Sequence, residues 1–355
     1  MSDDSGGAAG EGSALAVLDD ALREQFTWYV VAKKEFQDTV RSKGLWVLWL
    51  VFTVLFVTPA LLVITGFIEL SRQGQELGTE LLITDLPGAN YLNFVTVFLP
   101  LIAMFVGYAA LTKERESGSL KVLLSLPFSR RDVIVGKVIG RCAVVATTLA
   151  GAFAFTALLL VSSNITFNAE LYGLFVLFTM GLALVMVAIA VSISGAVQSG
   201  KWSLLANFFV YFYFTFVWNS LANGLGNLLN NRLGLGGPLR WQLTLFVKLL
   251  SPTQSYKTLV DSMVIPSDNG QRLARLEMFG RNADRGMICG DVLRGNFTTI
   301  QVQGFGNQTI PRQVCQAGQQ SVPVYFSDPA VFVYLVAWIG LAAAISYYTF
   351  DRVDL

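Results

Sequence analysis

The stretch YGLFVLFTMGLALVMVAIAVSI, residues 172–193, contains no charged side chain and is bounded by Glu170 and Lys201. A helix that crosses the roughly 30 Å hydrocarbon core of a bilayer needs about 20 consecutive, mostly apolar residues. This stretch meets that length, and it is too long for an ordinary core helix of a soluble domain. It therefore predicts a transmembrane helix.

Five further gaps between charged residues have a similar length and composition. The first predicted span in chain order, residues 45–68, is not a cleavable signal peptide, because this span starts well inside the chain and its apolar run is too long. The other predicted spans cover residues 45–68, 93–111, 142–161, 202–221 and 329–350. The predicted fold class is an all-α membrane protein with six transmembrane helices.

The composition excludes several classes of function. Hydrophobic residues make up 54% of the chain and charged residues 14%, against about 25% charged in soluble domains. The chain has no histidine and three cysteines, which argues against histidine-based catalysis and against Cys-rich metal sites. The net charge of +1 gives no bias toward nucleic acid. We therefore expect no catalytic, metal-binding or cofactor-binding residue, and no enzyme activity.

Lysine and arginine in the short links predict the orientation, because cytoplasmic flanks of spans are rich in both. They concentrate before the first span and between the second and third spans, whereas the link between the first and second spans has only Arg72. This places both termini in the cytoplasm of a multi-pass plasma-membrane protein. The long segment 223–328 then lies outside.

The N-terminal region divides into two parts. Residues 1–20 are mainly Gly, Ala, Ser, Asp and Glu, which is typical of a disordered acidic tail. Residues 21–44 mix Phe26, Trp28 and Tyr29 with Lys33 and Lys34, which suits an amphipathic helix at the cytoplasmic membrane surface. The alternative is a charged flank that only fixes the topology.

The link KERESGSLKVLLSLPFSRRDVIVGK, residues 113–137, predicts a helical hairpin. Its leucines recur at helical spacing, and Pro127 ends this first short helix. Ser129 and Asp132 form a capping box that starts a second helix. Arg130 and Arg131, in its first turn, are expected to contact lipid phosphates or an acidic partner. The hairpin either docks on another protein or rests on the membrane and contacts lipid alone.

Three motifs resemble those of a known family. They are Glu114-Arg-Glu116-Ser-Gly-Ser-Leu120 with the following residues to Lys137, Lys34-Glu35-Phe36 before the first span, and Leu250-Ser-Pro252-Thr-Gln-Ser-Tyr256. The chain resembles type 2 ABC transporter permeases, the exporter-type membrane subunits of ATP-binding cassette systems. It is most similar to the branch that includes the permease for nitrous-oxide-reductase maturation.

The resemblance implies partners and a coupling role for the hairpin. The chain has no G-x-x-x-x-G-K-S/T phosphate loop, so ATP and Mg²⁺ would be bound by a dimer of separate ATPase subunits. A second permease subunit, identical or homologous, is also implied. The residues expected to transmit the ATPase movement are Glu114, Glu116, Gly118, Leu120, Leu123, Leu124, Pro127, Arg130 and Arg131. The two carboxylates are expected to face a basic rim on the ATPase.

The external segment 223–328 contains two cysteines, Cys289 and Cys315. Disulfides form and persist in the oxidising environment outside the cytoplasm, so we expect these two cysteines to pair. Two unpaired thiols are the alternative. The apolar run 241–250 is too short to span a membrane. Interfacial or re-entrant helices are therefore expected there, followed by a strand-like polar stretch at 296–324.

Two functions remain open. The first is the permease subunit of an ATP-driven exporter, bound to lipid and to the ATPase. The second is a membrane assembly or anchoring protein that binds a partner through the external segment. The acidic tail, the absence of histidine and the few lysines are typical of a halophilic prokaryote such as an archaeon.

Overall fold

The computed structural model describes residues 17, 19–65, 85–86, 89–119, 129–163, 168–234, 236–264, 271–275, 284–303, 309–318 and 322–352. The predicted tail, residues 1–20, lies almost entirely outside this set.

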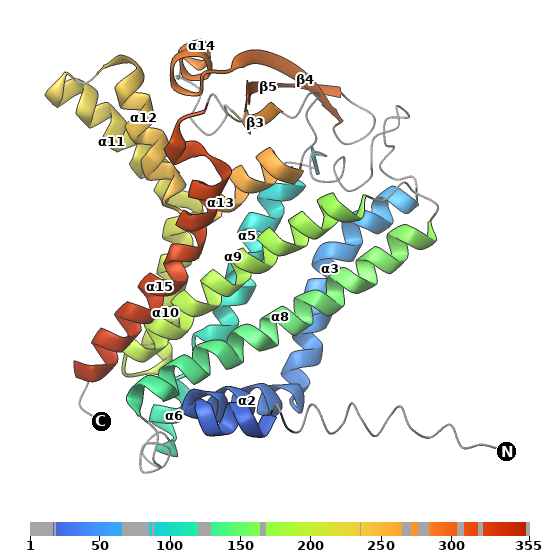
Figure 1. The fold of residues 1–355 in the computed structure, drawn as a ribbon, viewed down its shortest axis with the longest axis vertical. Coiled ribbons are helices and arrows are strands. Elements are labelled where there is room, and N and C mark those ends of the chain that lie inside the picture. The colour runs from blue at the N-terminus through green and yellow to red at the C-terminus, as the bar shows by residue number, and fades with distance from the viewer. Residues whose placement is uncertain are drawn as a thin grey trace.

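Six helical segments in the described part of the chain are long and apolar enough to cross a membrane, which confirms the predicted number (Figure 1). They pack around a common apolar core to which α5 and α9 contribute heavily. The segments are α3 (Lys43–Ile64), α5 (Tyr91–Gly107), α8 (Arg130–Ser162), α9 (Ala169–Ala196), α10 (Gly200–Phe212) continued by α11 (Trp218–Leu233), and α15 (Asp328–Arg352).

Helix α8 is much longer than the predicted span 142–161, because it begins at Arg130. The predicted span begins after Arg141, because a charged side chain interrupts the apolar run there. In the structure Lys137 and Arg141 are paired with carboxylates, so the helix continues through them. The second helix of the predicted hairpin is therefore the first part of the third span.

The fifth span also extends beyond its predicted end at residue 221. A π-helical turn, Tyr213–Val217, joins α10 to α11 without a break. Helix α11 ends at Gly234, whose φ of 64° lies in the left-handed region that glycine tolerates. The Asn- and Gly-rich residues at the start of the predicted external segment are thus helical.

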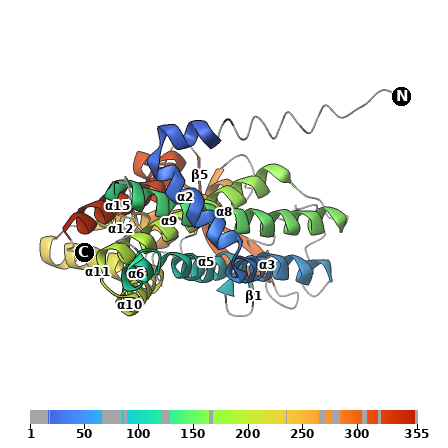
Figure 2. The same ribbon diagram turned by 90° about the horizontal axis from the view of Figure 1, so that it is seen from below.

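Helix α2 (Thr27–Val40) lies across one end of the bundle, against α8 (Figure 2). Two glycines of α8 permit this close approach. A Cβ atom on Gly136 would lie 2.6 Å from the Cβ of Val31, and one on Gly140 would lie 2.7 Å from the Cβ of Glu35. The expected helix is present, although one face packs on protein, and its position at a membrane surface stays a prediction.

The opposite end of the bundle carries a small sheet, which the all-α prediction did not include (Figure 1). Strand β5 (Thr309–Gly318) pairs antiparallel with β3 (Gln271–Arg275) on one side and β4 (Asn296–Gln303) on the other. The alternating stretch at 296–324 had indicated strands, but not their pairing. A short two-stranded ladder, β1 (Asp85–Leu86) and β2 (Ala89–Asn90), precedes α5.

A disulfide joins Cys289 to Cys315 within this sheet end, with their Cα atoms 5.4 Å apart. Cys315 lies on the central strand β5, opposite Phe297 of β4. Cys289 lies on a π-helical turn, Ile288–Val292, that follows α14 (Arg285–Met287). Both cysteines are buried. Because one lies on this turn and the other on the central strand, the bridge attaches the turn to the middle of the sheet.

Helices α12 (Gly237–Leu249) and α13 (Pro252–Leu259) connect the bundle to the sheet. All residues of α13 except Lys257 are buried, although most of them are polar. The hydroxyl oxygen of Tyr256 lies 3.0 Å from the hydroxyl oxygen of Thr179 in α9. The indole N–H of Trp338 in α15 donates to the carbonyl of Leu250. The Ser-Pro-Thr-Gln-Ser-Tyr motif is thus packed inside the bundle.

Candidate functional site

The short helix α6 (Thr112–Glu116) follows the second span at the end of the bundle where α2 lies. The hydroxyl oxygen of Ser194, near the end of α9, accepts hydrogen bonds from the backbone N–H groups of Leu111 (3.0 Å) and Thr112 (3.2 Å). All three residues are buried. The start of α6 is therefore attached to the end of the fourth span.

Two charged side chains of α6 bind the turn between α9 and α10. Arg115 donates from Nη1 to the carbonyl of Val197 at 2.6 Å. The carboxylate of Glu116 accepts a hydrogen bond from the N–H of Gly200 at 2.8 Å. The carboxylate of Glu116 thus lies next to Gly200, the first residue of α10, where the exposed N–H groups of that helix favour a negative charge. We call these two interactions and the Ser194 hydrogen bonds the turn contacts.

A second set of interactions joins α6 to α2 and α8. Lys137 of α8 places its Nζ atom 2.7 Å from Oε1 of Glu114 and 2.5 Å from Oε1 of Glu35. Arg141 lies 3.1 Å from the other oxygen of Glu35. We call Glu35, Glu114, Lys137 and Arg141 the charged cluster. Its two cations and two carboxylates balance, which is what a buried position requires.

Glu35 and Lys137 are the most enclosed members of the charged cluster, with side chains 12% and 1% exposed. Burial alone raises the pKa of Glu35, but the positive charges of Lys137 and Arg141 outweigh it and hold that pKa below its ordinary value. Glu35 is therefore ionised at neutral pH, and its ion pairs are intact.

The two sets of interactions make α6 a structural junction. The turn contacts lead to α9 and α10, and the charged cluster leads to α8 and α2. Helices α8, α9 and α10 therefore contact this segment of five residues directly, and α2 is joined to it through Lys137. Several of these contacts are short, charge-assisted hydrogen bonds, which are stronger than neutral ones.

Seven of the nine predicted coupling residues fall into three groups in the structure, and the other two, Arg130 and Arg131, lie in the first turn of α8. Glu114 and Glu116 lie on α6, but they bind Lys137 and Gly200 within the chain rather than projecting toward a partner. Gly118 follows α6 with a φ of 75°, a conformation that favours glycine. Leu120, Leu123, Leu124 and Pro127 lie outside the described residues, so the first predicted hairpin helix stays a prediction.

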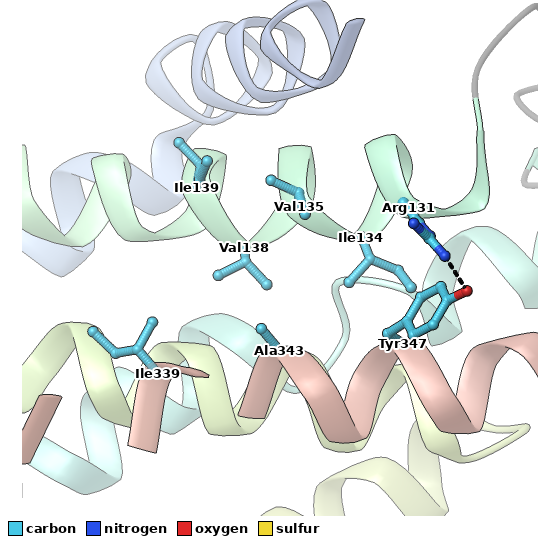
Figure 3. A pocket seen from close by; sticks show the side chains of 8 residues that line it. All are labelled: Arg131, Ile134, Val135, Val138, Ile139, Ile339, Ala343 and Tyr347. Carbon is cyan, nitrogen blue, oxygen red and sulfur yellow. Dashed lines mark hydrogen bonds between the residues drawn. The ribbon is translucent and has the colours of Figure 1, made fainter. Parts of the chain in front are cut away.

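The predicted capping box at the start of α8 is confirmed. The N–H of Asp132 donates to the hydroxyl of Ser129, and the N–H of Ser129 donates to the carboxylate of Asp132. The structure does not bring Arg131 to the charged cluster. Its guanidinium instead donates to the hydroxyl of Tyr347 on α15 (Figure 3).

Sequence reasoning did not assign Glu35, Lys137, Arg141 or Ser194 to the site. A signal was present for two of them, because Glu35 and Lys137 belong to the quoted motifs Lys34-Glu35-Phe36 and Val135-Gly-Lys137. Nothing in the linear spacing shows that these motifs, more than 100 residues apart, meet at one ion pair. Ser194 resembles any small residue of a packed span and carries no such signal.

The described residues contain no group of three His, Cys, Asp or Glu side chains that could hold a metal ion. The interactions around α6 pair oppositely charged groups rather than leaving a vacant ligand set. The expectation that this chain binds no cofactor stays a prediction.

Residues 29–355 match the family described as ABC-2 family transporter protein. A probable ABC transporter permease protein NosY from Stutzerimonas stutzeri is 28% identical over 235 residues, which cover 64% of this chain and 78% of that protein. The protein of the same name from Pseudomonas aeruginosa is 25% identical over 235 residues, or 64% of this chain and 79% of its own. Both matches agree with the motif resemblance.

Proposed function

The chain belongs to the ABC-2 family of transporter proteins, and on that premise we propose that it is the membrane subunit of an exporter driven by a separate ATPase. The ATPase would act through residues 113–137. The family establishes a membrane-spanning permease subunit; the export direction and the coupling route are our proposals.

The position of α6 is the observation that carries the coupling proposal. Helix α6 immediately precedes the first predicted helix of the hairpin, which ends at Pro127. It is bound to α9 and α10 by the turn contacts and to α8 by the charged cluster, in which Lys137 also joins α2. A partner that moves the first hairpin helix would therefore pull on both sets of interactions. Glu114 and Glu116 act inside the permease, which leaves the leucines Leu120, Leu123 and Leu124 to fill a groove in the ATPase.

The charge distribution supports a cytoplasmic location for this end of the bundle. Helices α2 and α6, the start of α8 and the end of α15 all lie here (Figure 1). The segments that form it are rich in lysine and arginine, as expected for cytoplasmic flanks. The sheet and its disulfide lie at the other end, where an oxidising compartment would preserve the bridge.

We propose an assembly of two ATPase subunits with two permease subunits, the second permease being identical or homologous to this chain. The ATPase subunits would bind ATP and Mg²⁺. Localisation in the cell membrane with both termini in the cytoplasm follows from the same orientation. The halophilic, archaeal origin stays a prediction from composition.

The substitution Leu123→Asp tests the coupling. Burying a leucine contributes roughly 1.5–3 kcal/mol, so a charged side chain at this position should release the ATPase or abolish its stimulation by the permease. The complex is purified in mild detergent, and ATPase retention and activity are measured. The matched control is Val324→Asp, which places the same charge at a position 85% exposed at the sheet end.

We expect normal expression of both variants, with loss of the ATPase only for Leu123→Asp. Retention of a fully stimulated ATPase by Leu123→Asp would contradict it. Loss of the ATPase only in Val324→Asp would instead favour a partner bound through the sheet end.

A further inference from the structure

The sheet end of the molecule carries an acceptor sequence for asparagine-linked glycosylation. Such a sequon is Asn-x-Ser/Thr, where x is any residue except proline. The chain contains three sequons, at Asn164-Ile-Thr166, Asn296-Phe-Thr298 and Asn307-Gln-Thr309. All three fall in links that the distribution of lysine and arginine places outside the cytoplasm, and none falls in a link on the inner side. The structure describes the middle one.

Asn296 is exposed and is the first residue of strand β4. Strand β4 lies at an edge of the three-stranded sheet, with β5 on one side and no strand on the other among the described residues (Figure 1). Two residues earlier, Arg294 turns the chain toward the strand with a φ of 53°. The amide of Asn296 therefore stands at a corner of the sheet that an enzyme can reach.

The extended backbone of β4 brings the two recognised side chains to one face. Side chains alternate along a strand, so Asn296 and Thr298 point to the same face and Phe297 points to the other. Phe297 lies opposite the buried Cys315, whereas Asn296 lies opposite Gln316. The face that carries the sequon amide and hydroxyl is therefore opposite to the face on which the disulfide lies.

We propose that Asn296 is a site of asparagine-linked glycosylation. Glycosylated sequons lie on the surface of segments outside the cytoplasm, so this site rests on the orientation given under the proposed function. The sugar donor is an oligosaccharide bound through its anomeric carbon to a polyisoprenyl phosphate or diphosphate. A separate glycosyltransferase catalyses the step.

The reaction is a substitution at the anomeric carbon of the donor. The Nδ2 atom of Asn296 forms a bond to that carbon, and the bond between the carbon and the phosphate oxygen breaks. The electron pair of the broken bond stays with the phosphate, which leaves with the proton lost by the amide. No group is oxidised or reduced, and the side chain remains an amide.

A glycan on Asn296 would cover the open edge of the sheet. The outer side of an edge strand presents N–H and C=O groups with which another chain can pair, and natural proteins protect such edges. A glycan is bulky and solubilising. It would keep a further strand from pairing along β4 and would shield Phe297, which is 46% exposed.

Glycopeptide mass spectrometry of the complete protein tests the assignment. The protein is purified from membranes of the cells that naturally produce it, and the occupancy of the Asn296 peptide is measured. We expect a glycan on most copies of this peptide. Thr298→Ala should abolish it, because the sequon loses its hydroxyl, whereas Thr298→Ser should retain it. Thr299→Ala, at the exposed neighbouring position of β4, is the matched control and should also retain it.

The substitution Gln37→Asn supplies a control from the opposite end of the bundle. It creates a sequon with Thr39 on α2, at an exposed position followed by a half-buried threonine, as in β4. We expect position 37 to stay unmodified while Asn296 carries its glycan.

An unmodified Asn296 in the wild type would overturn the proposal, and so would unchanged occupancy in Thr298→Ala. If a cysteine at Val324 still reacts with an impermeant maleimide in intact cells, the proposed orientation survives that result and only the glycosylation fails. A glycan at position 37 together with an unmodified Asn296 would overturn both the glycosylation of Asn296 and the orientation.

Discussion

Lys137 is the residue on which the interactions between α2, α6 and α8 converge. Its side chain is 1% exposed and its ammonium contacts carboxylates from two other helices. An enclosed charge of this kind is tolerated only while its partners are present. At the residue scale, the junction therefore depends on one lysine more than on either carboxylate.

Replacing Lys137 by Met should lower the free energy of unfolding by about 3–5 kcal/mol, because Glu35 and Glu114 would lose their shared cation. Thermal unfolding of the purified variant measures the loss. Lys201→Met, at an exposed position of α10, is the matched control and should unfold as the wild type does. Equal unfolding temperatures for the two variants would show that the charged cluster contributes little.

Lys248 of α12 gives a pH-dependent prediction. Its side chain is fully buried, and burial lowers the pKa of Lys248 to about 8. The unfolded chain, in which a lysine has a pKa near 10.4, binds more protons than the folded chain between these values. Stability should therefore rise by up to about 3 kcal/mol as the pH increases from 8 to 10.

This prediction is checked by measuring the unfolding temperatures of the wild type and of Lys248→Met between pH 7.5 and 10. The increase in unfolding temperature with pH should be smaller in Lys248→Met, whereas Lys201→Met should show the same increase as the wild type. If the wild type and Lys248→Met have identical slopes, Lys248 does not titrate in this range.

At the element scale, the contact between α2 and α8 depends on the absence of side chains at two positions of α8. A Cβ atom at Gly136 would lie 2.6 Å from Val31 and 2.7 Å from the carbonyl oxygen of Trp28. Neither neighbour is the flexible end of a side chain. The two helices would have to separate to accept one methyl group.

Gly136→Ala should destabilise the protein by about 1–3 kcal/mol, the usual effect of overpacking. Gly173→Ala, in α9, places its methyl group where no atom lies within 4 Å. It should be neutral or stabilise by up to about 1 kcal/mol, because alanine favours the helix. Thermal unfolding of both variants measures the difference. A Gly136→Ala protein as stable as Gly173→Ala would contradict the close packing of α2 on α8.

The elements differ in how far the sequence could predict them. Uncharged runs such as 172–193 are visible in the sequence because a lipid-spanning helix requires them. The extension of α8 through Lys137 and Arg141 was missed, because charge pairing with Glu35 is a tertiary event. The sheet pairing around Cys315 and the meeting of Glu114 with Lys137 depend on contacts between distant segments, which periodicity does not encode.

At the scale of the whole molecule, the structure has two unlike ends. One carries α2 and α6, and the other carries the sheet (Figure 1). The charged cluster belongs to the first of these ends, because it joins α2, α6 and the start of α8. A cysteine at Val324, which is 85% exposed at the sheet end, should react with an impermeant maleimide in intact cells. A cysteine at Lys201 should react only after lysis. Both are placed in a Cys142→Ser chain, and the opposite labelling pattern would invert the orientation.

We propose that an ATPase subunit docks on the segment after α6. A photo-crosslinking amino acid at Leu123 tests this docking, with one at Val324 as the control from the opposite end. We expect illumination of membranes to capture a P-loop ATPase at position 123 and not at position 324, as identified by mass spectrometry. Capture of lipid alone at position 123, or of the ATPase only at position 324, would contradict it.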